Sequence, residues 1–126
     1  MVPKLRNVDQ MSIQIIGEEL KNTSQLCREL KIDKKEFFGG SMTISSLGGI
    51  GGTHFTPIIN PPEVAILGVG KTFDRLVKEK NQIVSKKILP ISLSYDHRLI
   101  DGAEGARFCV YLGKCLGKDF AFKLAV

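Results

Sequence analysis

The spacing of apolar residues in the first third of the chain predicts an amphipathic helix. Between residues 10 and 30, apolar positions recur at three- and four-residue steps, which is typical of one helical face; they are Ile13, Ile16, Leu20, Cys27 and Leu30. Asp9 or Ser12 can cap the start of this helix, and Asp33 can cap a short turn in the charged connector that follows. We expect the helix to cover a sheet, and we assign it no chemistry.

Several shorter segments have the pattern of β-strands. Residues 41–45 alternate apolar and hydroxyl side chains, and residues 63–70 form a solid apolar run that predicts a strand buried on both faces. A further strand is expected at residues 88–95, with Pro90 near its start. Two weaker strands are expected at residues 2–6 and 55–60, and the polar residues 78–87 indicate a hairpin or an exposed loop.

A second helix is expected from residue 103 to about residue 116. Asp101, followed three residues later by Glu104, is a workable N-terminal cap. Ala106, Cys109 and Gly113 form a ridge of small residues that allows close packing on a sheet. The order of the elements predicts an α+β fold with helices on one face of the sheet. An apolar tail follows, for which a partner subunit is the natural cover; its apolar residues are Phe120, Phe122, Leu124 and Val126.

Composition narrows the class of protein. The 126 residues are 43% apolar and fit one domain. Eighteen basic against thirteen acidic residues give a formal charge of +5, which solubility alone explains, although an anionic ligand would be served equally well. No nucleic-acid-binding module accompanies the charge, so we expect no nucleic-acid partner. Because no apolar run is long enough to span a bilayer and no signal peptide opens the chain, we expect no membrane partner and a cytoplasmic location, or an organelle matrix if a targeting segment has been removed.

The cysteines carry no predicted chemistry. Cys27, Cys109 and Cys115 form no Cys-x-x-Cys pair, and their number is odd. We therefore expect free thiols in a reducing compartment, with neither a disulfide framework nor a metal site.

The most distinctive polar residues lie between Ser94 and Gly102. His97, one of two histidines, stands at an expected strand-to-helix junction among Asp96, Arg98 and Asp101. Histidine titrates nearest neutrality and can accept a proton on one ring nitrogen while it is held by the other, so this placement suits a general base. A structural histidine is the alternative. Asp101 can equally be a helix cap or an ion-pair partner of an arginine such as Arg98.

Other kinds of site fit the sequence less well. Residues 70–72 (Gly-Lys-Thr) match the end of a Walker A loop, but Ala65 replaces its first glycine. The glycines of residues 48–52 fail as a dinucleotide fingerprint because His54 stands at the third glycine position. No Gly-x-Ser-x-Gly elbow is present for a serine hydrolase. Ser45, at a strand end beside flexible backbone, suits a hydroxyl donor to a developing oxyanion better than a nucleophile.

The stretch Ser94-Tyr-Asp-His-Arg-Leu-Ile-Asp-Gly102 resembles the His-x-x-x-Asp-Gly signature of the 2-oxoacid dehydrogenase acyltransferases. These are the dihydrolipoyl acyltransferase cores of the pyruvate, 2-oxoglutarate and branched-chain complexes, related in fold to chloramphenicol acetyltransferase. The resemblance covers essentially the whole chain and implies a mixed sheet covered by helices, a partial chloramphenicol-acetyltransferase-like fold. Other stretches that carry it are Gly39-Gly-Ser-Met-Thr-Ile-Ser45, Phe55-Thr-Pro-Ile-Ile-Asn-Pro-Pro-Glu63 and Ala65-Ile-Leu-Gly-Val69.

The resemblance implies transfer of an acyl group between coenzyme A and a dihydrolipoyl group carried on a separate lipoyl domain, without a metal. It implies that His97 is the base that takes the proton of the attacking thiol. Ser45 would steady the tetrahedral oxyanion, and Asp101 would support the active-site loop. It further implies a homo-oligomer, in which Ser45 faces a neighbour's His97 within a trimer. The trimers would build a cage that binds lipoyl domains and the other subunits of the complex.

The finer assignments follow from the same resemblance. The glycine-rich stretch after Ser45 and the Phe-Thr-Pro-Ile stretch look most like acetyl-transferring, pyruvate-type members, with succinyl as the alternative acyl group. Residues 1–126 match the C-terminal part of the family's catalytic domain, and we expect its N-terminal part, the lipoyl domain and the subunit-binding domain to be absent. Two interpretations therefore stay open: an active acyltransferase, or a catalytically incompetent fragment or scaffold of the oligomeric core.

Overall fold

The computed structural model describes residues 2–117 and residue 120. The chain divides into two compact units, one of Met1–Gly40 with Gly117–Val126 and one of Ser41–Leu116. Phe122, Leu124 and Val126 of the expected apolar tail lie outside the described residues. Within the described residues, no helix has both the length and the apolar character needed to cross a membrane.

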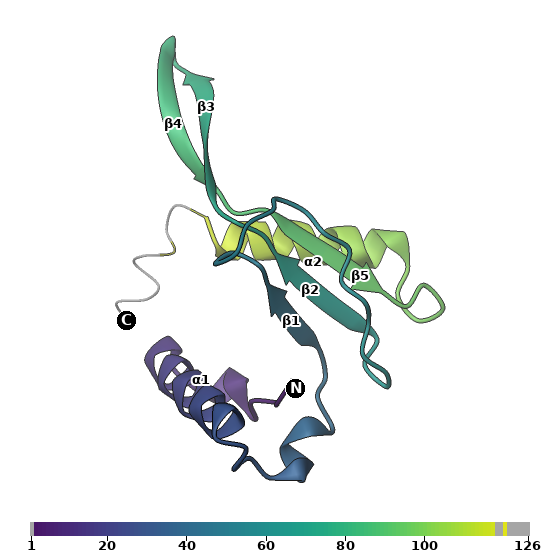
Figure 1. The fold of residues 1–126 in the computed structure, drawn as a ribbon. Helices are drawn as coiled ribbons and strands as arrows, with labels where there is room; N and C mark the ends of the chain where they lie inside the picture. The colour runs from purple at the N-terminus through teal and green to yellow at the C-terminus, as the bar shows by residue number, and fades with distance from the viewer. Residues whose placement is uncertain (1, 118–119, 121–126) are drawn as a thin grey trace. The chain divides into compact units, whose positions relative to one another are not determined.

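The first unit contains the predicted amphipathic helix, α1, at Ile13–Arg28 (Figure 1). Its cap is Ser12 rather than Asp9, because the Ser12 Oγ accepts a hydrogen bond from the Ile15 backbone N–H at 3.3 Å. Asp9 lies in a preceding 3-10 turn, η1, at Val8–Gln10. No residue of α1 is buried, and its expected place over a sheet stays a prediction.

Two short segments of the first unit complete its description. Asp33 caps the 3-10 turn η2 (Lys34–Phe37) by accepting a hydrogen bond from the Lys35 N–H at 3.0 Å, as predicted. The predicted strand at residues 2–6 is wrong. The Lys4 N–H donates to the Glu36 carbonyl at 2.8 Å, but a strand needs a ladder of such bonds to an extended neighbour.

The second unit is built on a three-stranded mixed sheet in the order β1–β2–β5, which confirms the expected fold class. β1 (Thr43–Ser46) is parallel to β2 (Ala65–Val69), and β5 (Ile91–Tyr95) is antiparallel to β2. The first four residues of β2 are buried, as their solid apolar run predicted. The central strand is therefore the core of this unit (Figure 1).

The predicted strand at residues 55–60 is wrong, because this segment is irregular. Pro57 has no N–H to donate to a ladder, and Pro61 and Pro62 follow directly. The segment instead packs on the sheet through side chains. A carbon added at Gly68 would lie 2.9 Å from Cζ of Phe55 and 3.3 Å from Cγ of Pro57.

A two-stranded hairpin extends from the sheet (Figure 1). Its strands are β3 (Phe73–Glu79) and β4 (Gln82–Ile88). Lys80 and Asn81 join them with φ angles of 45° and 67°, the positive values that a tight hairpin turn requires. Of the two alternatives expected for residues 78–87, the hairpin is confirmed, but it begins earlier, at Phe73. However, the strand expected at residues 88–95 divides at Pro90, so that Ile88 ends β4 and Ile91 begins β5.

The last helix, α2, spans Gly102–Cys115 and is capped as predicted, with the Asp101 Oδ1 accepting from the Glu104 N–H at 2.8 Å. The predicted ridge of small residues is wrong, because Ala106 and Gly113 are exposed. The helix face that packs on the sheet is displaced by one residue towards the N-terminus at both of these positions. The face that packs contains the buried Gly105 and the half-buried Cys109 and Leu112, which share one side of a helix. At Gly105 a Cβ would lie 2.8 Å from Cε1 of Tyr95 in β5.

Because of this contact, replacing Gly105 by alanine is expected to change the stability of the unit in the opposite direction to the same change at Gly113. Gly105→Ala is expected to destabilise the second unit by about 1–2 kcal/mol, because the added methyl overlaps the Tyr95 ring. Gly113→Ala is the matched control: no atom lies within 4 Å of the added carbon, so the better helix former is expected to stabilise by about 0.5–1 kcal/mol. Urea unfolding followed by circular dichroism measures both changes. Equal effects of the two substitutions would contradict this packing.

Candidate active site

The turn between β5 and α2 presents His97 to solvent. The Asp96 N–H donates to the Val64 carbonyl at 2.8 Å, which continues the sheet by one residue. The Asp96 carbonyl accepts from the N–H groups of Leu99 and Ile100, each at 3.0 Å, which closes the turn. His97 is exposed within this turn, and its ring lies 5.7 Å from the Tyr95 ring between centroids, tilted by 40°.

The two residues that flank His97 bind each other. The Arg98 guanidinium donates to both Asp96 carboxylate oxygens, with Nε–Oδ1 at 2.9 Å and Nη2–Oδ2 at 2.6 Å, and the Arg98 backbone N–H donates to Oδ1 at 3.0 Å. These bonds, the side-chain ones first, hold the pKa of the Asp96 carboxyl at about 2. Arg98 therefore pairs with Asp96, and the alternative pairing with Asp101 is wrong. Asp101 is the cap of α2.

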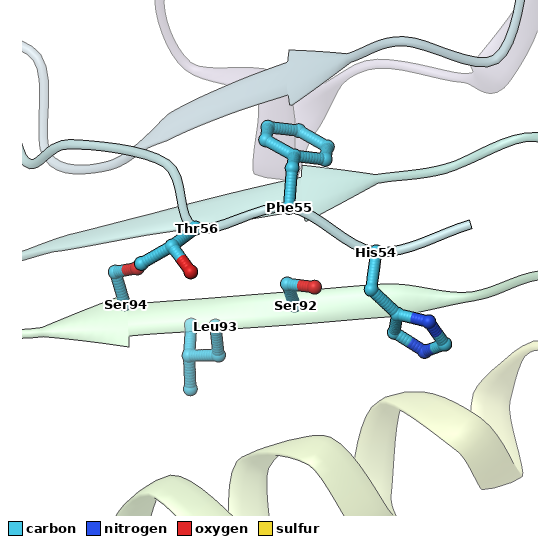
Figure 2. A pocket seen from close by; sticks show the side chains of 6 residues that line it. All are labelled: His54, Phe55, Thr56, Ser92, Leu93 and Ser94. Atoms are coloured by element: carbon cyan, nitrogen blue, oxygen red, sulfur yellow. The ribbon is translucent and has the colours of Figure 1, made fainter. Parts of the chain in front are cut away.

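Ser45 belongs to a row of small residues on one face of the sheet. Ser45 in β1 lies opposite Gly68 in β2, which lies opposite Ser92 in β5, and directly opposed residues share a face. The Phe55 ring lies against Gly68, since a carbon added there would lie 2.9 Å from its Cζ, and Figure 2 shows this ring beside the sheet. Ser45, which is half-buried on the edge strand β1, thus lies one strand away from an apolar wall formed by the Phe55 ring.

Ser45 and His97 do not meet within one chain. Two strand spacings separate β1 from β5, which is ~10 Å across the sheet. Through Gly68, Ser45 lies level with Ser92 of β5. Tyr95 lies three residues further along β5, which is ~10 Å. His97 follows Tyr95 beyond the end of the sheet, so the two Cα atoms are more than ~14 Å apart by this geometry. The structure therefore does not bring these two side chains together within one chain.

A hollow of ≈ 380 Å³ adjoins the Ser45–Gly68–Ser92 row, because Ser92 belongs to both. The hollow lies between the irregular segment and β5 (Figure 2), and its lining residues are His54, Phe55, Thr56, Ser92, Leu93 and Ser94. Sequence reasoning gave His54 no role beyond breaking a glycine pattern, and it did not assign Ser92 or Ser94. Their signal was the alternation of serines with apolar residues in β5.

The competing sites do not form. Residues 70–72 lead from β2 directly into β3, whereas a phosphate loop must open a helix. No group of three or more His, Cys, Asp or Glu in the described part of the chain is arranged to hold a metal ion. Cys27, Cys109 and Cys115 are free thiols.

The sequence profile of the 2-oxoacid dehydrogenases acyltransferase (catalytic domain) matches residues 1–121. The chain belongs to this family. Two of its curated members are named dihydrolipoyllysine-residue acetyltransferase component of pyruvate dehydrogenase complex. That of Cupriavidus necator is 47% identical over 120 residues, covering 95% of this chain and 22% of the relative. That of Haemophilus influenzae is 51% identical over 116 residues, covering 92% of this chain and 20% of the relative. The chain thus spans about a fifth of the length of these relatives.

Solved structures of the 2-oxoacid dehydrogenase acyltransferases have the same fold. The dihydrolipoamide acetyltransferase of Azotobacter vinelandii matches with a TM-score of 0.90 and 47% identity, over 96% of this chain and 50% of that one. The cubic core of a pyruvate dehydrogenase multienzyme complex matches with a TM-score of 0.90 and 46% identity, over the same shares. The roles of a serine, a histidine and an asparagine in the catalytic mechanism of the Azotobacter enzyme have been investigated.

The Asp96–Arg98 pair makes stability depend on pH. Because the folded-state pKa of Asp96 is about 2, below the ordinary 3.8, its contribution to stability is complete above that ordinary value and is lost as the pH falls through about 2. We expect Asp96→Asn to lower the Tm near neutral pH and the deficit to shrink as the pH falls from 3.8 towards 2. Thermal unfolding of the wild type and of Asp96→Asn across this pH range measures the difference in Tm, with Asp9→Asn as the control. A deficit that is independent of pH would contradict the ion pair.

Proposed function

We propose that this protein is an acyltransferase that moves an acetyl group between coenzyme A and a dihydrolipoyl group carried on a lipoyl domain. One observation carries the proposal. The intervals along the chain between the serine, histidine and asparagine of the Azotobacter enzyme are the same as those between Ser45, His97 and Asp101 here. Aspartate and asparagine both accept a hydrogen bond at a helix N-terminus, so we assign Asp101 the role of holding the His97 turn against α2.

The proposed reaction uses two side chains of this chain. A thiol with a reference pKa of about 8.5 is largely protonated at neutral pH, and only the thiolate attacks well. The His97 imidazole takes the proton of the attacking thiol, and the sulfur adds to the thioester carbonyl. The Ser45 hydroxyl donates a hydrogen bond to the resulting oxyanion. Collapse of the tetrahedral intermediate breaks the old carbon–sulfur bond, and the leaving thiolate takes the proton back from the imidazolium.

The proposed site lies between copies of the chain. Because Ser45 and His97 are far apart in one chain, the hydroxyl of one copy would face the imidazole of the next. Such a head-to-tail contact forms a closed ring when the rotation that relates one copy to the next is a whole fraction of a turn. We propose that this ring is a trimer. We further propose that trimers build a cage that binds lipoyl domains and the other complex subunits. Residues 1–126 would supply the C-terminal part of the catalytic domain, in the cytoplasm of a bacterium or in a mitochondrial matrix.

Mixing two inactive variants tests the chemistry and the shared site together. His97→Ala is expected to lower acetyl transfer from acetyl-coenzyme A to dihydrolipoamide by a factor on the order of 10²–10⁴. Ser45→Ala is expected to lower it by a factor on the order of 10²–10³. In an equal mixture, dissociated and reassembled, roughly a quarter of the sites would pair an intact Ser45 with an intact His97, so activity should return.

Each outcome of the mixing experiment has a definite meaning. Activity that is unchanged in His97→Ala would overturn the role of His97. Two inactive variants that give no activity on mixing would overturn the shared site. Inactivity of the wild type under the same conditions would favour the scaffold interpretation of this chain over the enzyme.

The surroundings of Ser45 favour acetyl over succinyl. The Phe55 ring lies over Gly68, the residue next to Ser45 in the row of small residues. A methyl group can pack against this ring, whereas the free carboxylate of a succinyl group would lose water there without a charged partner in return.

We therefore expect Phe55→Ala to shift acyl preference towards longer chains. The ratio of kcat/KM for butyryl-coenzyme A to that for acetyl-coenzyme A should rise by a factor on the order of 10, because each methylene in an apolar pocket changes discrimination by about that much. Ile58→Ala is the matched control, since Ile58 is 89% exposed in the same irregular segment. A ratio that stays at the wild-type value in Phe55→Ala would contradict this wall.

A further inference from the structure

On the N-terminal side of His97, the backbone is held by Asp96, which follows Tyr95, the last paired residue of β5. Asp96 is bound through its N–H to Val64 and through its carbonyl to the N–H groups of Leu99 and Ile100. His97 itself makes no hydrogen bond among those recorded for the described residues. The direction in which the imidazole leaves the turn therefore depends on how its two neighbours, Asp96 and Arg98, are held.

Arg98 holds the other side of His97. Its backbone N–H and its guanidinium both bind the Asp96 carboxylate, so that a closed ring of bonds spans the histidine from one neighbour to the other. Two parallel N–H···O bonds to one carboxylate fix orientation as well as distance. The Asp96 side chain is 21% exposed, whereas that of Arg98 is 88% exposed. The arginine thus covers the carboxylate and is itself covered by no other part of the described chain.

The same pair also sets the net charge of the residues on either side of His97. The elements around His97 carry several ionisable groups: Glu63 beside the Val64 carbonyl that binds Asp96, Tyr95 at the end of β5, Asp96 and Arg98 in the turn, and Asp101, Glu104, Arg107 and Lys114 from the cap and body of α2. Arg98 is the cation that binds the carboxylate of the residue before His97. Loss of this cation would leave that negative charge uncompensated, which would favour the imidazolium over the neutral base.

We propose that Arg98 is a positioning residue for acyl transfer: its clamp on Asp96 sets the direction of the His97 ring and cancels the negative charge of the residue that precedes it. This inference rests on the proposed function for its catalytic consequence. Its structural consequence, the control of His97 protonation by Arg98, can be measured without any assay of activity.

Two substitutions separate the geometric effect from the charge effect. Arg98→Gln removes the cation, and Arg98→Lys keeps the charge but cannot form the two-bond fork. In Arg98→Gln we expect kcat to fall by a factor on the order of 10–10², because a small misplacement of a catalytic group is costly, while the KM for coenzyme A stays unchanged. The acid limb of the kcat/KM profile should move to higher pH. In Arg98→Lys the acid limb should return to the wild-type position, with kcat only partly restored.

The chain offers an internal reference for the protonation measurement. It has two histidines, so their ring C–H resonances can be followed by NMR against pH in each variant. In Arg98→Gln the titration midpoint of His97 should move upward while that of His54 does not change. In the double variant Asp96→Asn/Arg98→Gln the midpoint should return towards the wild-type value, because the carboxylate that Arg98 covers has been removed as well. Arg75→Gln, an exposed arginine of β3, is the matched control and should change neither histidine.

The outcomes are distinguishable. A His97 midpoint in Arg98→Gln equal to that of the wild type would overturn the clamp, whatever the activity. A rise in the KM for coenzyme A at unchanged kcat would also overturn it, since Arg98 would then bind the substrate. If the NMR shift occurs but His97→Ala keeps full activity, the proposed function is wrong while the clamp stands.

Discussion

The burial of β2 between strands of opposite direction is the constraint on which the Ser41–Leu116 unit depends. In β2, Ala65, Ile66 and Leu67 are only 8%, 5% and 8% exposed. The backbone of this strand forms a parallel ladder with β1 on one side and an antiparallel ladder with β5 on the other. Side chains alternate between the faces of a strand, so a slip of one residue would turn every side chain to the opposite face. In β5 such a slip would turn Ser92 out of the hollow and Tyr95 away from α2. Register therefore fixes the site before any polar contact does.

Each face of this sheet is completed by an aromatic ring that lies against a glycine. On one face Phe55 packs on Gly68, and on the side of α2 Tyr95 packs on Gly105. A β-carbon at either glycine would overlap the ring, so the absence of a side chain is what permits both contacts. Tyr95 also lies against His97. The packing of α2 thus reaches the candidate base through one ring, which links the stability of the unit to the orientation of the imidazole.

Local patterns predicted those parts of the fold whose cause is local. The buried β2 and the Asp101 cap were correctly expected, and the hairpin and the Ser12 cap were each one of two expected alternatives, since each depends on residues within a few positions. The strand expected at residues 55–60 does not form, because Pro57 has no N–H to donate to a ladder and two further prolines follow the segment. The ridge of α2 was displaced by one residue because Tyr95, a residue distant in sequence, selects which helical face packs.

The residues alone made the candidate site predictable as a set, and its arrangement was expected only from the family resemblance. A motif can identify His97, Ser45 and Asp101, but it is the strand register that separates Ser45 from His97 in one chain. Likewise, Asp101 was expected to be either a helix cap or an ion-pair partner of Arg98, and the turn geometry decides for the cap, because Arg98 binds Asp96.

A site shared between copies would also account for apolar surface beside both site residues. Ile44, which precedes Ser45, is 68% exposed, and Leu99, in the same turn as His97, is 67% exposed. Exposed apolar groups of this size gain free energy when a partner removes them from water. In the proposed assembly, association would therefore bury these side chains and bring the hydroxyl to the imidazole in the same event. Coupling of this kind ties activity to assembly, since dilution that separates the copies removes the hydrophobic stabilisation and the catalytic pair together.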